Sequence, residues 1–114
     1  MIAKRFAIAA ALSMVVLIPQ PARAFECPRQ IVAAQKAIDK VTAGMKGMAK
    51  KMKRRDMALV HALLDDAKMR LAAARHNHGK PQGRFDHARS IAKAVAAQGY
   101  ARAADILHSK MMAK

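Results

Sequence analysis

Apolar residues recur at spacings of three and four along most of the chain, and this pattern constrains the fold more than any other feature. The clearest stripe contains Ile31, Ala34, Ile38, Val41, Met45, Met48 and Met52. A stripe of period 3.5 is typical of a helix that buries one face against other helices. We expect this helix to open at Cys27 and Pro28, since proline is tolerated at the first helical position. No segment after Pro28 alternates apolar and polar residues as a strand does, so the sequence predicts an all-α protein.

A second stripe of the same kind predicts a second helix. Its positions are Val60, Leu64, Ala67, Leu71, Ala74 and His78. We expect Asp56 to cap the start of this helix and Gly79 to end it in the left-handed conformation, with Pro81 soon after. Gly44 and Gly47 weaken the middle of the first helix, so they predict a kink or a break there. Helices joined by short connections pack antiparallel, so the two stripes predict a helical hairpin.

The remaining residues predict one or two further helices packed on this hairpin. Asp86 is expected to cap a third helix, and the residues expected on its buried face are Ala88, Ile91, Ala92 and Val95. Further along, Tyr100, Ala104, Leu107 and Met111 align with one another, but on a different face of a continuous helix. We therefore expect a break at Gln98 and Gly99 followed by a short fourth helix, with a single kinked helix as the alternative.

These helices form one domain, a three- or four-helix bundle that covers residues 25–114. Its core is expected to be thin, because many of the buried positions are alanines. Small single cores are only marginally stable. A bound partner, a metal ion or self-association is therefore expected to add to the stability of the domain.

Residues 1–24 have the order of features typical of a secretory signal peptide. Lys4 and Arg5 precede an uncharged, mostly apolar run at residues 6–18, prolines follow, and Ala22-Arg23-Ala24 supplies a small-residue cleavage site. The run is shorter than the roughly 20 residues that span a bilayer. We expect export by the general secretory route, cleavage after Ala24 and a periplasmic location.

The chain is strongly basic, with a formal net charge of +15. Its densest group of charges is Lys50, Lys51, Lys53, Arg54 and Arg55. Such a run is most often a solvated turn, but it is also typical of a patch that binds an acidic protein or an anionic membrane surface. A basic cytosolic protein would suggest a nucleic-acid partner, which we do not expect for an exported chain.

Three histidines lie close together in the sequence at the expected turn between the second and third helices. His76 and His78 fall in the last turn of one helix, and His87 falls in the first turn of the next. Neutral imidazole is the commonest protein ligand for zinc, copper and nickel, so the three predict a site for a divalent transition metal. Asp86 could add an oxygen ligand. The alternative is a helix end that two cationic histidines stabilise.

Two sulfur-containing groups are weaker candidates for a functional site. A single cysteine in an exported protein indicates an intermolecular disulfide or a reactive thiol, and a helix start beside Cys27 would favour its thiolate. A small capping residue is the alternative. Met45, Met48 and Met52 could suit Cu(I), but their places on the first stripe favour a core position.

No arrangement of nucleophile and base or of paired carboxylates stands out, so we do not expect an enzyme. The first functional hypothesis is an exported accessory protein that binds an acidic partner or an anionic surface through its basic residues. The alternative is a small periplasmic metal-binding protein that uses the histidine cluster. A helical chaperone that uses its methionine and alanine faces is a third hypothesis. No cofactor other than such a metal is expected.

Overall fold

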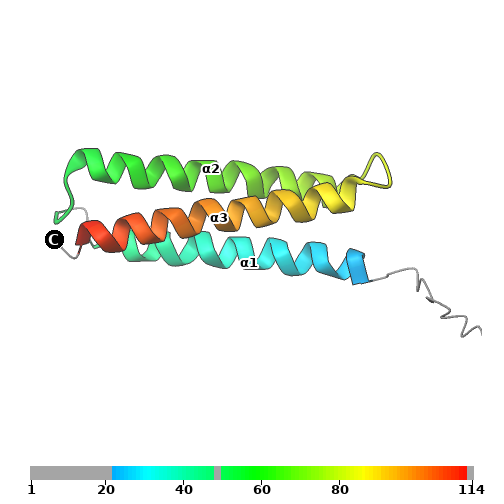
Figure 1. The fold of residues 1–114 in the computed structure, drawn as a ribbon, viewed down its shortest axis with the longest axis horizontal. Helices are drawn as coiled ribbons and strands as arrows, with labels where there is room; N and C mark the ends of the chain where they lie inside the picture. The colour runs from blue at the N-terminus through cyan, green and yellow to red at the C-terminus, as the bar shows by residue number, and fades with distance from the viewer. Residues whose placement is uncertain (1–21, 48–49, 113–114) are drawn as a thin grey trace, which may run out of the picture.

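A computed structural model describes residues 22–47 and 50–112, and this part of the chain forms three long helices without any strand (Figure 1). The helices are α1 (Ala22–Met45), α2 (Arg54–Gly79) and α3 (Asp86–Met112). The all-α prediction is therefore confirmed. Met48 and most of the expected signal peptide, with Lys4, Arg5 and the apolar run, lie outside the described residues.

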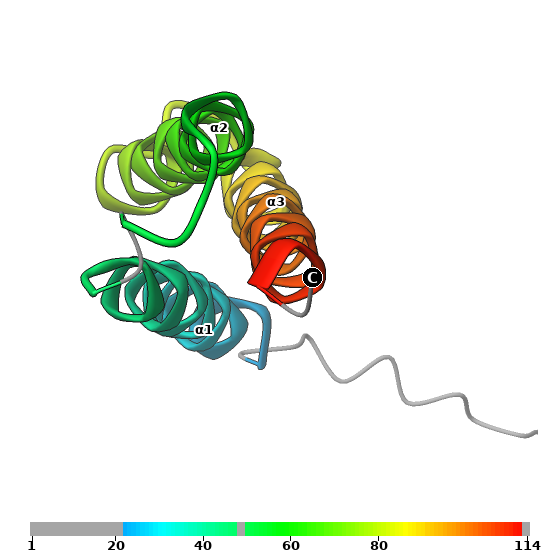
Figure 2. The ribbon, with the colours of Figure 1, turned by 90° about the vertical axis from the view of Figure 1, so that its left-hand side faces the viewer.

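The three helices run up, down and up along one another. Seen end-on, they lie at the corners of a triangle (Figure 2), and α3 packs against both of the others more extensively than α1 packs against α2. The starts of α1 and α3 therefore lie at the same end of the bundle as the last turn of α2 (Figure 1). None of the helices in the described part is both long enough and apolar enough to cross a membrane.

The first two stripes form the core as predicted. Their buried members are Ile31, Ala34, Ile38, Val41 and Met45 on α1, and Val60, Leu64, Ala67, Leu71 and Ala74 on α2. Met52 is also buried, although it lies in the connection between α1 and α2. The expected break near Gly44 and Gly47 is confirmed, because α1 ends at Met45.

The predictions for α3 were wrong in two respects. The helix continues through Gln98 and Gly99 to Met112, so the expected break is wrong, the described residues contain no fourth helix, and the alternative of a single helix is the one observed. Its buried face is a row of mostly small residues, which are Asp86, Ser90, Ala94, Ala97, Ala101, Ala104 and His108. Ala88, Ala92 and Val95 are exposed and Ile91 is only half-buried.

The size of the side chains explains the face that α3 buries. Alanine and serine let the backbone of α3 approach both neighbouring helices closely, whereas Ile91 or Val95 in the same place would hold the helices apart. The larger apolar residues flank this row instead. Tyr100, Leu107 and Met111 are half-buried and pack against the core from its edge.

Three predictions about helix ends also need correction. Pro28 lies inside α1, which begins at Ala22, and not at the first helical position. Gly79 belongs to α2 and has no positive φ. The C-cap is Lys80, whose N–H donates to the carbonyl of His76 at 2.9 Å. Asp56 is not the N-cap of α2, because Lys53 holds that position without a side-chain hydrogen bond. Asp56 lies in the first turn, where a negative charge favours the helix dipole.

Candidate metal centre

Three potential metal ligands from three different helices meet at one end of the bundle. Cys27 lies near the start of α1, His78 in the last turn of α2 and His87 in the first turn of α3. One ligand atom from each residue lies within 4.8 Å of the other two. The sequence predicted His76, His78 and His87 as ligands. The structure brings His78 and His87 together as predicted, but the third member is Cys27 and not His76.

The separation between sulfur and nitrogen is close to that of a coordinated site. Sγ of Cys27 lies 3.8 Å from Nδ1 of His87. Zinc bonds of about 2.3 Å to sulfur and about 2.0–2.1 Å to nitrogen place these two atoms about 3.5 Å apart in a tetrahedral site. For this pair, only a small contraction would therefore be needed to hold an ion.

The cysteine is shielded from solvent, whereas the two histidines are partly accessible to it. Cys27 is fully buried, and its thiol donates a hydrogen bond to the carbonyl oxygen of His87 at 3.2 Å. His78 and His87 are half-buried, and their ring centroids lie 5.7 Å apart in an edge-to-face arrangement. Nδ1 of His78 is buried without a hydrogen-bond partner among the described residues. Such a nitrogen costs about 1–3 kcal/mol, and an ion bound by it would remove that penalty.

His76 does not join the group, because side chains two positions apart on a helix point about 200° away from each other. Since α2 stays helical through Gly79, the two histidines diverge. His76 is exposed and lines a surface cavity of about 250 Å³ with polar neighbours from the connection, among them Gln82 and Asp86. His78 continues the buried stripe of α2 and therefore faces α1 and α3.

Asp86 holds the connection beside the group but is not one of its members. Its buried carboxylate accepts hydrogen bonds from the backbone N–H of Gln82 and from the guanidinium of Arg89 at 3.0 Å. The bond from Gln82 lowers the pKa of Asp86 below its ordinary 3.8, burial opposes this effect, and Arg89 adds to it. The carboxylate therefore fixes the residues that lead into α3 and so places His87.

A second fixed point ties α2 to α3 close to the histidines. The hydroxyl of Ser90, which is fully buried, donates to the carbonyl oxygen of Ala74 at 2.7 Å. These two residues lie about one turn from His87 and His78 on their respective helices. Sequence reasoning did not single out Ser90, because a serine on a helix carries no signal of burial by itself.

Sequence reasoning also missed that Cys27 belongs with the histidines. One signal was present, since Cys27 lies four residues before Ile31 and so extends the first buried stripe by one turn. His78 extends the second stripe in the same way. In an antiparallel hairpin, the start of the first stripe and the end of the second stripe lie at the same end.

The other candidate residues lie away from this group. Lys50, Lys51, Lys53, Arg54 and Arg55 are all exposed at the opposite end of the bundle. They are separated from His78 by most of α2, or about 35 Å at 1.5 Å per residue. His61 is exposed on α2, and His108 is buried near the end of α3 beside Gly44.

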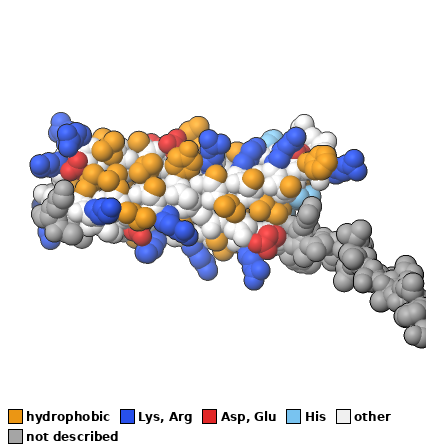
Figure 3. Space-filling model, in the orientation of Figure 1, with side chains coloured by type: hydrophobic (Ala, Val, Ile, Leu, Met, Phe, Trp, Pro, Cys, Tyr) orange, Lys and Arg blue, Asp and Glu red, His pale blue; other side chains and the backbone are white. Residues whose placement is uncertain are grey.

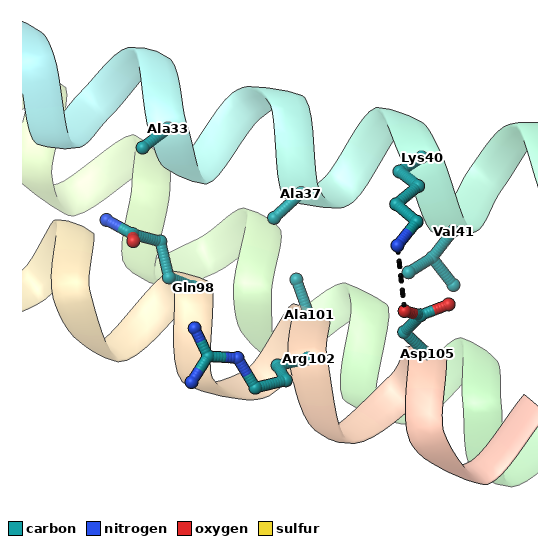
Figure 4. A pocket seen from close by; sticks show the side chains of 8 residues that line it. All are labelled: Ala33, Ala37, Lys40, Val41, Gln98, Ala101, Arg102 and Asp105. Atoms are coloured by element: carbon teal, nitrogen blue, oxygen red, sulfur yellow. Dashed lines mark hydrogen bonds and ion pairs between the residues drawn. The ribbon is translucent and has the colours of Figure 1, made fainter.

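A cavity between α1 and α3 has fewer side chains that could bind a metal or act as a nucleophile. It has a volume of about 270 Å³, and alanines from both helices form much of its wall. Nζ of Lys40 crosses it to Oδ2 of Asp105 at 3.3 Å, while Gln98 and Arg102 lie further along (Figure 4). Its lining contains neither a thiol nor an imidazole, so we assign it no metal and no nucleophile.

Comparisons of the chain with protein-family models, with curated proteins and with solved structures gave no match.

Proposed function

We propose that this chain is a small exported protein that binds a transition-metal ion through Cys27, His78 and His87. The observation that carries the proposal is the approach of their ligand atoms to within 4.8 Å from three separate helices. His78 and His87 are neighbours across the connection between α2 and α3, but Cys27 is 51 and 60 positions away from them and reaches them only through the packing of α1. Their convergence at a half-buried position is what a metal-binding protein requires.

The donor atoms favour zinc or copper. One thiolate and two imidazoles form a borderline-soft set, which suits Zn(II), Cu(I) and Cu(II), whereas Mg(II) and Ca(II) prefer oxygen ligands. Three protein ligands leave a further position of a four-coordinate ion open to water or to a donor from another molecule. An open position suits a protein that carries or buffers metal, because an incoming ligand can start the transfer.

We propose a binding role and not a catalytic one. The nearby carboxylate of Asp86 is engaged by Gln82 and Arg89, so it is not placed to act as a general base towards a metal-bound water. The metal would instead serve the fold. It would clip together one end of each helix in a bundle whose core contains many alanines.

Export is part of the proposal, and Pro28 gives it structural support. Cleavage after Ala24 would make Pro28 the fourth residue of the mature chain and Cys27 the third. A proline within the first turn of a helix removes no intrahelical hydrogen bond, because the first four N–H groups have no helical partner. In the uncleaved helix, by contrast, Pro28 leaves the carbonyl of Ala24 without its usual donor.

Metal content and thermal melting of the purified, reduced protein test the proposal. A ligand that binds only the folded state stabilises it by about 2.7 kcal/mol at a hundredfold excess over Kd. We expect Zn(II) to raise Tm clearly and Mg(II) to leave it unchanged. Cys27→Ser should lose most of the shift, and His61→Gln, a change on the exposed surface of α2, should keep it. A Tm that no transition metal moves, or a full shift in Cys27→Ser, would contradict the proposal.

A further inference from the structure

The end of the bundle opposite the metal-ligand group carries a dense set of cations, which we call the basic tip. It consists of Lys50, Lys51, Lys53, Arg54 and Arg55, and all five side chains are exposed. Figure 3 shows Lys and Arg gathered at this end of the molecule. Among them, Arg55 has an acidic neighbour, with its Nε 3.7 Å from Oδ1 of Asp56. The tip therefore presents a net positive charge to its surroundings.

A hollow of about 420 Å³ opens within the basic tip. Lys51, Lys53 and Arg55 line it together with Asp56, and two methionines, Met52 and Met111, complete the lining. Met52 is buried and belongs to the core, while Met111 comes from the last turns of α3 and is half-buried. The hollow thus combines three cations and one carboxylate, which leaves it net positive, with two flexible apolar side chains, which adapt readily to an apolar ligand.

We propose that the basic tip docks the protein on an anionic lipid surface. The phosphate of a headgroup would lie against Lys51, Lys53 and Arg55, and the carbon atoms next to it would lie against Met111 and Met52. Lysine acts as a compact point charge without a fixed geometry, so a fluid array of headgroups suits these side chains. Each basic residue close to an anionic membrane contributes a favourable binding free energy of similar size.

The size of the tip favours a lipid surface over an acidic protein. Three helix ends, each about 10 Å across, present only a few hundred square ångströms. A stable protein complex buries about 800 Å² on each partner, so a protein would have to reach along the sides of the bundle. A membrane needs no such area, because several independent charge contacts supply the affinity.

Docking by the tip would set the orientation of the whole molecule. With the basic tip on the membrane, the metal-ligand group would lie about 35 Å away along the bundle, towards the aqueous phase. The docking does not depend on whether a metal binds, so the two proposals can fail separately.

Two variants with equal loss of charge test the docking on vesicles of phosphatidylcholine containing roughly one third phosphatidylglycerol. The tip variant carries Lys51→Gln, Lys53→Gln and Arg55→Gln. The control carries Lys36→Gln, Lys68→Gln and Arg102→Gln, at exposed positions about 13 Å or more along their helices from this end. We expect the tip variant to bind roughly a hundredfold more weakly and the control to lose only a few-fold, because exposed charges are screened over about 10 Å. Circular dichroism should show the same helix content in both.

Two further measurements use the same vesicles. Met111→Gln is expected to weaken vesicle binding several-fold, because the apolar part of the hollow is lost. Equal binding to pure phosphatidylcholine vesicles, or equal losses in the two triple variants, would overturn the proposal. So would release by millimolar inorganic phosphate at constant ionic strength, which would identify a site for a free anion. Binding to an acidic protein but not to the anionic vesicles would assign the tip to a protein partner instead.

Discussion

The Sγ atom of Cys27 lies 3.8 Å from Nδ1 of His87, although the two residues are 60 positions apart in the sequence. This contact joins the start of α1 to the start of α3, and the last turn of α2 brings His78 to the same place. The ligand group therefore forms only when all three helices have packed. Metal binding by this chain should report on its tertiary structure and not on a local sequence motif.

The two neighbouring histidines of α2 give the sharpest test of this geometry. His78→Gln should lower the affinity for Zn(II) roughly a hundredfold or more, since even groups that only orient a ligand are worth about 10–100-fold. His76→Gln should leave the affinity within a few-fold, because His76 is exposed and lies outside the group. Competition with a chromophoric chelator measures both. Equal losses would show that α2 unwinds at Gly79 and that His76 is also a ligand.

The first two helices could be predicted because large apolar residues mark their buried faces. Ile31, Ile38 and Val41 share one face of α1, Leu64 and Leu71 share one face of α2, and all five are buried. The candidate ligand group could be predicted only in part. Histidine and cysteine occur both in cores and on surfaces. The stripes place Cys27 and His78 at the same end of the bundle, but their contact with His87 depends on how the three helices pack.

The face of α3 could not be predicted from hydrophobicity, because alanine occurs on every side of this helix. Ala88 and Ala92 are exposed, whereas Ala94 and Ala97 are fully buried. What selects the buried row is close approach to two neighbouring helices, and this selection depends on side-chain size. Val95 is therefore exposed, although its size suggested a buried position and so gave the false appearance of a break at Gly99.

Alanine-to-leucine changes on α3 distinguish the observed face from the expected one. Ala97→Leu should destabilise the protein by about 1–3 kcal/mol, because a larger side chain in a close-packed row forces the helices apart. Ala92→Leu, on the face first expected to be buried, should change the free energy of unfolding by no more than about 0.5 kcal/mol. Urea denaturation followed by circular dichroism measures both. The opposite ranking would mean that α3 is rotated about its axis.

Gly99 offers a separate test of the continuity of α3. It lies in the middle of the helix, is exposed, has no positive φ, and a Cβ placed on it would meet no atom within 4 Å. Gly99→Ala should therefore stabilise the protein by about 0.5–1 kcal/mol, because alanine loses less backbone entropy in a helix. Thermal denaturation would show the gain. A loss of stability would indicate a break at Gly99 that needs glycine.

The charge of the Asp86 carboxylate stabilises the start of α3, where His87 lies. It is buried at the start of α3, where it accepts the N–H of Gln82 and pairs with Arg89. These contacts hold the pKa of Asp86 below its ordinary 3.8, with the bond from Gln82 as the largest cause. Because the folded state favours the ionised form, the carboxylate stabilises the fold at every pH above that ordinary value. The contribution falls away as the pH drops through the folded pKa, where the carboxylate takes up a proton.

Asp86→Asn should therefore lower Tm at neutral pH, and its difference from the wild type should shrink as the pH is taken below about 3.8. Asparagine keeps an oxygen for Gln82 but loses the charge that Arg89 needs. The backbone N–H of Gln82 should exchange faster in the variant, because the residues before α3 are held less firmly. Asp65→Asn, on the exposed surface of α2, is the matched control and should show neither effect. A loss of Tm in Asp86→Asn that persists unchanged into strong acid would assign the role of Asp86 to its shape and not to its charge. It would also remove the electrostatic explanation for how His87 is positioned.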